Sequence, residues 1–298
     1  MERIQPTPDI LRHMQGRYFI PTDKGVAFLD PIHQRPIEAW RPPQSVLENE
    51  RLGRGLSWLA EAGNAGRLTI QMMLSFHVGR DDFEDVVEQY PDVLERAFLI
   101  GIEAHRPASD DSSAIIPQPP IEIAEHPGRA DFQRAQYDWL KEHGKIILPC
   151  EYTGAGDAHD ELAEHLDRLQ GIYEVATDNA DGSLDPRARN KVRAIADGAQ
   201  QSMRQWMTLG QMGYVLSQFD DAGYIPHSRY IEVPLMVGSW HRPSAQRLIN
   251  LGVPVAIYEA NRTTPYDTEL LERYGEIYMD IIANGRATNE QLEFMLPF

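Results

Sequence analysis

A chain of 298 residues, 42% of them hydrophobic, is long enough to bury a full core and is close to the upper size of a single domain. The 45 acidic residues outnumber the 28 basic ones, and this negative field argues against nucleic acid or an anionic membrane as a partner. Cys150 is the only cysteine, which excludes an internal disulfide and a zinc site built from several thiolates.

The chain also lacks the segments that direct proteins into or across membranes. No stretch approaches the ~20 apolar residues that a membrane helix requires, and residues 1–16 lack the apolar run of a signal peptide. We therefore expect a soluble, cytoplasmic protein.

The predicted elements alternate between helix and strand along the chain. After a weak opening strand at residues 18–21, helical patterns and short β-branched or apolar runs follow one another, often with a glycine between them. The predicted helices are 45–62, 82–96, 131–143, 157–170, 186–209, 244–251 and 266–283. The predicted strands are 68–77, 98–105, 145–152, 171–178, 213–220, 229–239 and 253–261.

This alternation is typical of an α/β fold with a parallel sheet. About eight strands are the number that a (β/α)8 barrel requires, so we expect a barrel-like fold, complete or incomplete. The connection 220–229 is too short for a helix, which leaves an open doubly wound sheet as the alternative. We expect a single α/β domain over residues 1–298, with an extended N-terminal segment, 1–43, and a long proline-rich lid loop, 105–129.

Polar residues close several of these strands, where barrels and open α/β sheets place their sites. Because residues two apart share one face of a strand, Glu103, Glu151 and Glu259 are expected to point toward the mouth with His77 and His105. Trp240, His241 and Tyr152 lie near the same strand ends and could contact substrate. The structural alternative is that acids end strands because loops are polar.

Clustered carboxylates can divide into a general acid and a nucleophile or base, because their mutual repulsion separates their pKa values. The leading hypothesis is therefore a glycoside-type hydrolase without a cofactor, in which Glu151, Glu259 and Glu103 are catalytic and the substrate is a carbohydrate or another small molecule. The alternative is a metal-dependent sugar isomerase, epimerase or hydrolase, with a divalent metal on Glu151, Asp220, His241 and Glu259.

A third hypothesis comes from a different class of protein. The proline-rich segments 33–44 and 107–127 could be extended arms of a non-catalytic assembly or virion protein. The sequence leaves the oligomeric state open.

Two short motifs resemble those of known enzyme families. Residues 81–85, DDFED, resemble the magnesium motif of class I terpene synthases, and residues 153–158, TGAGDA, resemble the anion-hole signature of ribokinase-like sugar kinases. Each match covers only a few residues, and acids that cap a helix N-terminus explain both.

Overall fold

The computed structural model describes residues 19–22, 25–28, 49–104, 116–151, 186–225, 230–260, 268–284, 286–288, 290, 291 and 294. The chain divides into two compact units. Unit 1 contains residues 1–45, 156–203 and 269–298, and unit 2 contains residues 46–155 and 204–268. The prediction of a single domain remains a prediction. Within the described residues, no helix has the length and hydrophobicity needed to span a membrane.

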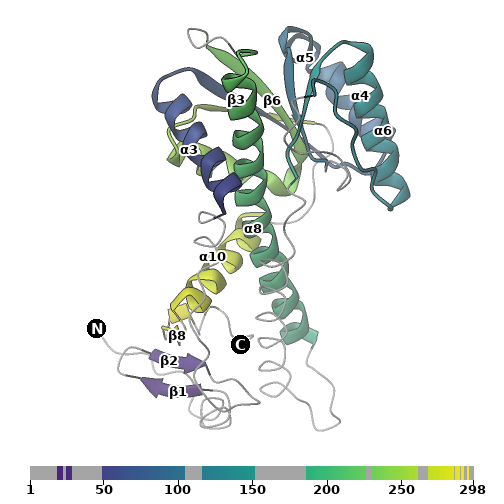
Figure 1. The fold of residues 1–298 in the computed structure, drawn as a ribbon. Helices are drawn as coiled ribbons and strands as arrows, with labels where there is room; N and C mark the ends of the chain where they lie inside the picture. Colours follow the sequence, from purple (N-terminus) through teal and green to yellow (C-terminus); the bar gives the residue numbers. More distant parts are fainter. Residues whose placement is uncertain are drawn as a thin grey trace. The chain divides into compact units, whose positions relative to one another are not determined.

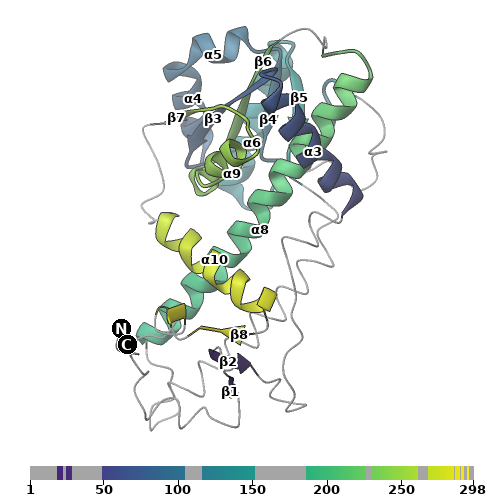
Figure 2. The same cartoon turned by 90° about the vertical axis from the view of Figure 1, so that its left-hand side faces the viewer.

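Unit 1 combines a small antiparallel sheet with helical segments. β1 (Phe19–Thr22) and β2 (Gly25–Phe28) form a hairpin, and β8 (Arg286–Ala287) pairs with β2 on its other side. α10 (Thr268–Asn284) crosses the first part of α8 (Pro186–Asp221) where two helix glycines meet (Figure 2).

Unit 2 is built on a five-stranded parallel sheet with the order β5-β4-β6-β3-β7. Its strands are β3 (Leu68–Ser75), β4 (Leu99–Ile102), β5 (Ile146–Pro149), β6 (Ile231–Gly238) and β7 (Val255–Glu259). The α/β class and the parallel sheet are therefore confirmed. Among the described strands, β5 and β7 each pair with one neighbour, and these strands do not form an eight-stranded barrel.

Helices cover both faces of this sheet (Figure 1). The helices of unit 2 are α3 (Glu50–Asn64), α4 (Arg80–Gln89), α5 (Pro91–Arg96), α6 (Pro127–Glu142), residues 204–221 of α8, and α9 (Ser244–Asn250). α3, α8 and α9 share a core with one face of the sheet, and α4, α5 and α6 with the other. Consecutive residues of β3 illustrate this, since Met72 belongs to the core with α3, α8 and α9, and Met73 to the core with α4, α5 and α6.

The helix crossing between α3 and α8 depends on glycine. A Cβ on Gly55 would lie 1.8 Å from the carbonyl oxygen of Gly210, so the two backbones touch where no side chain fits. This contact seats α8 tightly against α3 beside the sheet.

The prediction of a strand at residues 213–220 is wrong, because this stretch is the last part of α8. Leu209, Met212, Leu216 and Phe219 are buried in one core, and their spacing of three or four residues is helical. α8 itself is therefore the connection that leads into β6, and the short link 220–229 needs no helix of its own. The predicted helix 82–96 is two helices, because Pro91 interrupts it and begins α5.

The described part of the proline-rich segment covers the free edge of β5. Ile147 donates its backbone N–H to the carbonyl oxygen of Pro117 at 2.8 Å, and Tyr137 donates its hydroxyl to that of Pro119 at 2.8 Å. Residues 116–126 are thus packed on their own unit and do not extend away from it, and the expected lid loop, 105–129, remains a prediction. Residues 33–44 and 105–115 lie outside the described residues.

Cys150 follows β5 directly and is fully buried. Its thiol donates to the carbonyl oxygen of Leu148 at 3.1 Å. Burial raises the pKa of this thiol far above its usual range, so it is a structural group and not a nucleophile.

Candidate functional site

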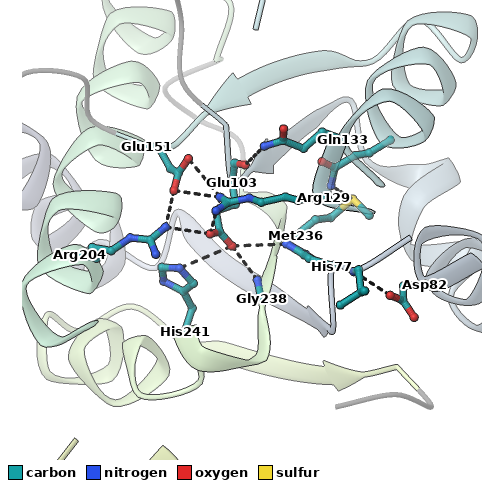
Figure 3. Close-up of polar contacts among 12 residues, drawn as sticks. His77, Asp82, Glu103, Arg129, Gln133, Glu151, Arg204, Met236, Gly238 and His241 are labelled. Atoms are coloured by element: carbon teal, nitrogen blue, oxygen red, sulfur yellow. Dashed lines mark hydrogen bonds and ion pairs between the residues drawn. The ribbon is translucent and has the colours of Figure 1, made fainter. Parts of the chain in front are cut away.

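Four predicted site residues meet at the carboxyl ends of the parallel strands. Glu103 directly follows β4, Glu151 lies two residues beyond β5, and His77 lies two residues beyond β3. His241 ends the short 3-10 helix η1 (Ser239–His241), which continues from β6. The loops after four strands thus supply one cluster (Figure 3).

Glu103 is the centre of the cluster. Its Oε2 accepts the backbone N–H of Gly238 at 2.9 Å and lies 3.5 Å from Nδ1 of His77 and 3.6 Å from Nε2 of His241. Its Oε1 accepts from Nη2 of Arg129 at 2.9 Å and from Nη2 of Arg204 at 3.0 Å. The side chain is only 7% exposed, so this carboxylate is held from several directions at once.

Glu151 shares both guanidinium groups with Glu103. Its Oε1 accepts from Nη2 of Arg204 at 2.5 Å and from Nη2 of Arg129 at 3.3 Å. In Figure 3, Arg204 enters from the left and Arg129 from the right, and they meet at the two carboxylates. Two buried carboxylates and two guanidiniums therefore form a charge-balanced quartet (Glu103, Glu151, Arg129, Arg204).

The backbone holds His77 in an uncommon conformation. Its φ is 55°, in the left-handed region that residues other than glycine rarely adopt and that often marks a functional position. Asp82 fixes the following residues, because its Oδ2 accepts the backbone N–H groups of Val78 at 2.8 Å and Gly79 at 3.2 Å. The imidazole also stacks on Phe132, with ring centroids 4.0 Å apart.

The first turn of α6 packs closely against this loop. A Cβ on Gly128 would lie 2.2 Å from the carbonyl oxygen of Val78, so only glycine permits the approach. The next residue, Arg129, extends its side chain from there to Glu103 and Glu151. The contact at Gly128 therefore fixes the backbone of Arg129 relative to the loop of His77.

Burial and neighbouring charges set the protonation of the cluster. Burial would raise the pKa of Glu103, but His241, His77 and Arg204 outweigh it and lower that pKa well below its usual range. Burial lowers the pKa of His77 from 6.5 to about 4, although the charge of Glu103 acts in the opposite direction. At neutral pH Glu103 is therefore ionised and His77 is neutral.

The two imidazoles are arranged alike around Glu103. Each turns one nitrogen toward the carboxylate, and each has a second, buried nitrogen without a hydrogen-bond partner among the described residues: Nε2 of His77 and Nδ1 of His241. A neutral His77 that carries its proton on Nδ1, the nitrogen nearer Glu103, keeps the lone pair on Nε2.

Buried polar side chains support the loop that carries His241. Gln205 of α8 donates its side-chain amide to the carbonyl oxygen of Trp240 at 3.2 Å, and its amide oxygen accepts from the guanidinium of Arg247. Both Gln205 and Arg247 are buried, and Arg247 also lies over the ring of Trp206. Trp240 thus takes part through its backbone carbonyl in fixing the loop.

Glu259 does not join the cluster. It ends β7, its side chain is 42% exposed, and its carboxylate is paired with Arg242. Three strands separate β7 from β5 in the sheet, which places the strand of Glu259 about 19 Å from the strand that precedes Glu151. The expected pairing of Glu151 with Glu259 is therefore not found.

Asp220 is on α8 and not at a strand end, and its contact with Arg67 places it near the amino end of β3, opposite the carboxyl ends where the cluster lies. It accepts hydrogen bonds from Trp58 at 3.0 Å and from Arg67 at 3.2 Å, and Arg67 directly precedes β3. The ligand set proposed for a metal, Glu151, Asp220, His241 and Glu259, is consequently not gathered. The described part of the chain contains no group of three or more His, Cys, Asp or Glu side chains that could hold a metal ion.

The remaining predictions have separate outcomes. His105 and Tyr152 lie outside the described residues, as does the motif at residues 153–158. Asp82, from the motif at residues 81–85, binds the backbone at the start of α4, as expected of a helix cap.

The sequence analysis missed both arginines. Arg204 belongs to a run of polar residues at helical spacing on the otherwise buried α8, with Gln205, Thr208 and Gln211 all buried. That stripe is a signal which periodicity could have revealed. Arg129 directly follows Pro127 and Gly128 at a helix start, and this pattern alone indicates only the beginning of a helix.

Comparison of the chain with protein-family models, with curated proteins and with solved structures gives no match in any of the three.

Proposed function

We propose that the cluster around Glu103 is the active site of a hydrolase in which His77 acts as the general base. The observation that carries this proposal is the neutral imidazole of His77, held in a left-handed backbone conformation with Nδ1 3.5 Å from Glu103. A carboxylate that orients a neutral histidine is a recurrent arrangement for proton transfer.

Each group has a role in this proposal. The negative charge of Glu103, 3.5 Å from Nδ1 of His77, favours the tautomer that keeps its proton on Nδ1, so Nε2 can take a proton from a water molecule that reaches it when substrate binds. The water oxygen bonds to the electrophilic carbon or phosphorus, and negative charge moves to the substrate oxygen. The intermediate then expels its leaving group, which takes the proton back from Nε2.

The guanidiniums of Arg129 and Arg204 favour reactions in which negative charge develops. Attack on a carbonyl or phosphoryl group produces an anionic oxygen, which fixed cations stabilise. Cleavage of a glycosidic bond passes through a transition state of oxocarbenium character, whose positive charge these guanidiniums would oppose. We therefore favour ester, amide or phosphoester hydrolysis over the glycoside hydrolysis expected from the sequence.

The lowered pKa of Glu103 and the separation of Glu151 from Glu259 also argue against glycoside hydrolysis. A glycosidase of this kind needs a carboxylic acid that remains protonated near neutral pH, whereas the pKa of Glu103 is lowered. In the pair expected from the sequence, Glu151 follows β5 and Glu259 ends β7, and these strands are not neighbours in the sheet.

We also infer that unit 2 is an open doubly wound sheet. The strand order β5-β4-β6-β3-β7 has strands on both sides of β6 and β3, and the chain after β3 turns toward β4 while the chain after β6 turns toward β7. Ligands in such sheets bind beyond the carboxyl ends where connections diverge in this way. His77 follows β3 and His241 follows β6, which places both beside this divergence.

The test is a panel of chromogenic carboxylic esters, anilides, phosphoesters and glycosides, assayed with the wild-type chain and with His77→Gln and Glu103→Gln. We expect turnover of a carbonyl or phosphoryl substrate, and a loss of at least 100-fold in kcat for His77→Gln. His143→Gln is the matched control, because His143 is exposed on the surface at the end of α6.

Three results would contradict the proposal. Turnover restricted to glycosides would restore the carbohydrate hypothesis. Turnover that His77→Gln leaves unchanged would remove this residue from the chemistry. Concentration-dependent assembly into large particles, without turnover of any substrate, would favour the assembly hypothesis.

A further inference from the structure

The contacts within the described part of the chain use only part of the hydrogen-bonding capacity of the two arginines in the quartet. Among the described residues, every hydrogen bond that Arg129 and Arg204 donate comes from Nη2. A guanidinium carries five N–H donors, three of them on Nε and Nη1. The side chains are 32% and 33% exposed, so these remaining donors are not sealed inside the protein.

The carboxylates hold these donors in fixed positions. Because Glu103 and Glu151 anchor both Nη2 atoms, neither arginine has to lose its full side-chain entropy when a ligand binds. The charges of the quartet also balance, and His77 is neutral, so the site is locally free of the excess negative charge that the chain carries as a whole.

The start of α6 supplies a second, independent feature that favours an anion. This helix of 16 residues has no acidic residue in its first turn, and no side chain caps its N-terminus. Within the described residues, no acid of its own first turn and no side-chain cap therefore offsets its positive end. Arg129 lies in that first turn, and Gly128 packs against the loop of His77.

We propose that Arg129 and Arg204, with the N-terminus of α6, bind an anionic group of the substrate, a carboxylate or a phosphate, beside His77. That the bound anion belongs to a substrate rests on the proposed function, whereas the anion site itself does not. The substrate class is then a small molecule that carries an anionic group close to the ester, amide or phosphoester bond that is hydrolysed.

The experiment measures anion binding without catalysis. Inorganic phosphate and succinate are titrated separately into the full-length chain, and the Nε–H signals of the arginine side chains are followed by NMR. Sodium chloride at equal ionic strength is the reference. The variants are Arg129→Lys and Arg204→Lys, which keep the charge opposite the buried glutamates but remove the fork geometry.

Two further variants guard against loss of folding and unspecific effects. Arg204→Gln combined with Glu151→Gln removes one charge of each sign and so leaves no unpaired carboxylate. Arg67→Lys is the matched control, because Arg67 pairs with Asp220 at the amino end of β3, away from the cluster at the carboxyl ends.

We expect saturable binding of at least one anion by the wild type and by Arg67→Lys, and affinity at least tenfold weaker in each variant of Arg129 and Arg204. The anion that binds more tightly identifies the class. No saturable response to either anion, or affinities within threefold of the wild type in the lysine variants, would overturn the proposal and leave the arginines as counterions only. Binding without turnover of any panel substrate would overturn the hydrolase and keep the anion site, so the two failures are distinguishable.

Discussion

The burial of His77 makes the stability of unit 2 depend on pH in a predictable window. The pKa of His77 is about 4 in the folded protein and 6.5 in an unfolded chain. Between these two pH values His77 binds a proton in the unfolded chain but not in the folded protein. The free energy of unfolding therefore falls as the pH decreases from about 6.5, and the loss is complete at about pH 4.

The two pKa values determine the size of the effect. Between pH 7.5 and pH 4.5, linkage to His77 alone removes roughly 2.5 kcal/mol from the free energy of unfolding. The variant His77→Gln lacks this proton, so its stability should decline less over the same range by that amount. The lowered pKa of Glu103 also removes stability in acid, but only below about pH 4.5, and it does so in both proteins.

The assay is urea denaturation at several pH values from 7.5 to 4.5, followed by tryptophan fluorescence. Four of the five tryptophans, at positions 58, 139, 206 and 240, belong to unit 2 and report on it. His143→Gln, with its exposed side chain, should keep the pH dependence of the wild type. Equal pH dependence in the wild type and His77→Gln would refute the argument that burial keeps His77 neutral.

Three other substitutions test the structural basis of the site and the fold. Asp82→Ala removes the acceptor of two backbone N–H groups, and we expect the free energy of unfolding to fall by about 1–2 kcal/mol. The loop should also relax, so that the pKa of His77, followed by NMR, moves up toward 6.5. An unchanged pKa of His77 would show that Asp82 acts only as a structural cap. Phe132→Leu removes the aromatic ring stacked on His77, and we expect the free energy of unfolding to fall by about 1–2 kcal/mol. An NMR titration should show a higher pKa of the His77 imidazole. An unaltered titration would show that Phe132 is not what buries this imidazole. Gly55→Ala forces apart the backbones of α3 and α8; thermal unfolding should show a loss of at least 2 kcal/mol, and an unchanged melting temperature would contradict the close crossing.

Much of the sheet could be predicted because its strands are short apolar runs bounded by glycine and polar residues. The predictions for β3, β4, β5, β6 and β7 all overlap the observed strands. The error at residues 213–220 arose because a helix buried against a sheet is as apolar as a strand over a few residues. That stretch was one of the roughly eight strands on which the expected barrel rested.

The convergence of His77, Glu103, Glu151 and His241 was expected, but the reason given for it was incomplete. The expectation used one inward face, as in a barrel, whereas this sheet is buried on both faces and Leu99 and Ile147 belong to different cores. The residues meet because they follow the carboxyl ends of their strands, whichever face the strand residues before them occupy. Glu259 is at a carboxyl end as well, as the last residue of β7, but β7 is at the edge of the sheet.

The arginines could not be inferred from strand ends, because both lie on helices. Arg129 and Arg204 are separated by 75 positions in the sequence, and only the packing of α6 and α8 against opposite faces of the sheet brings their guanidiniums to the same carboxylates. Local periodicity contains no information on such a meeting.

The buried thiol of Cys150 has a practical consequence for experiments in solution. Because it is the only cysteine and is protected in the folded state, alkylating reagents should treat the native chain as if it contained none. A cysteine introduced at an exposed position would then be a unique attachment point for a spectroscopic label. The rate at which Cys150 itself is modified would report how often the sheet opens around β4 and β5, since reagent can reach the thiol only when that part of the core separates.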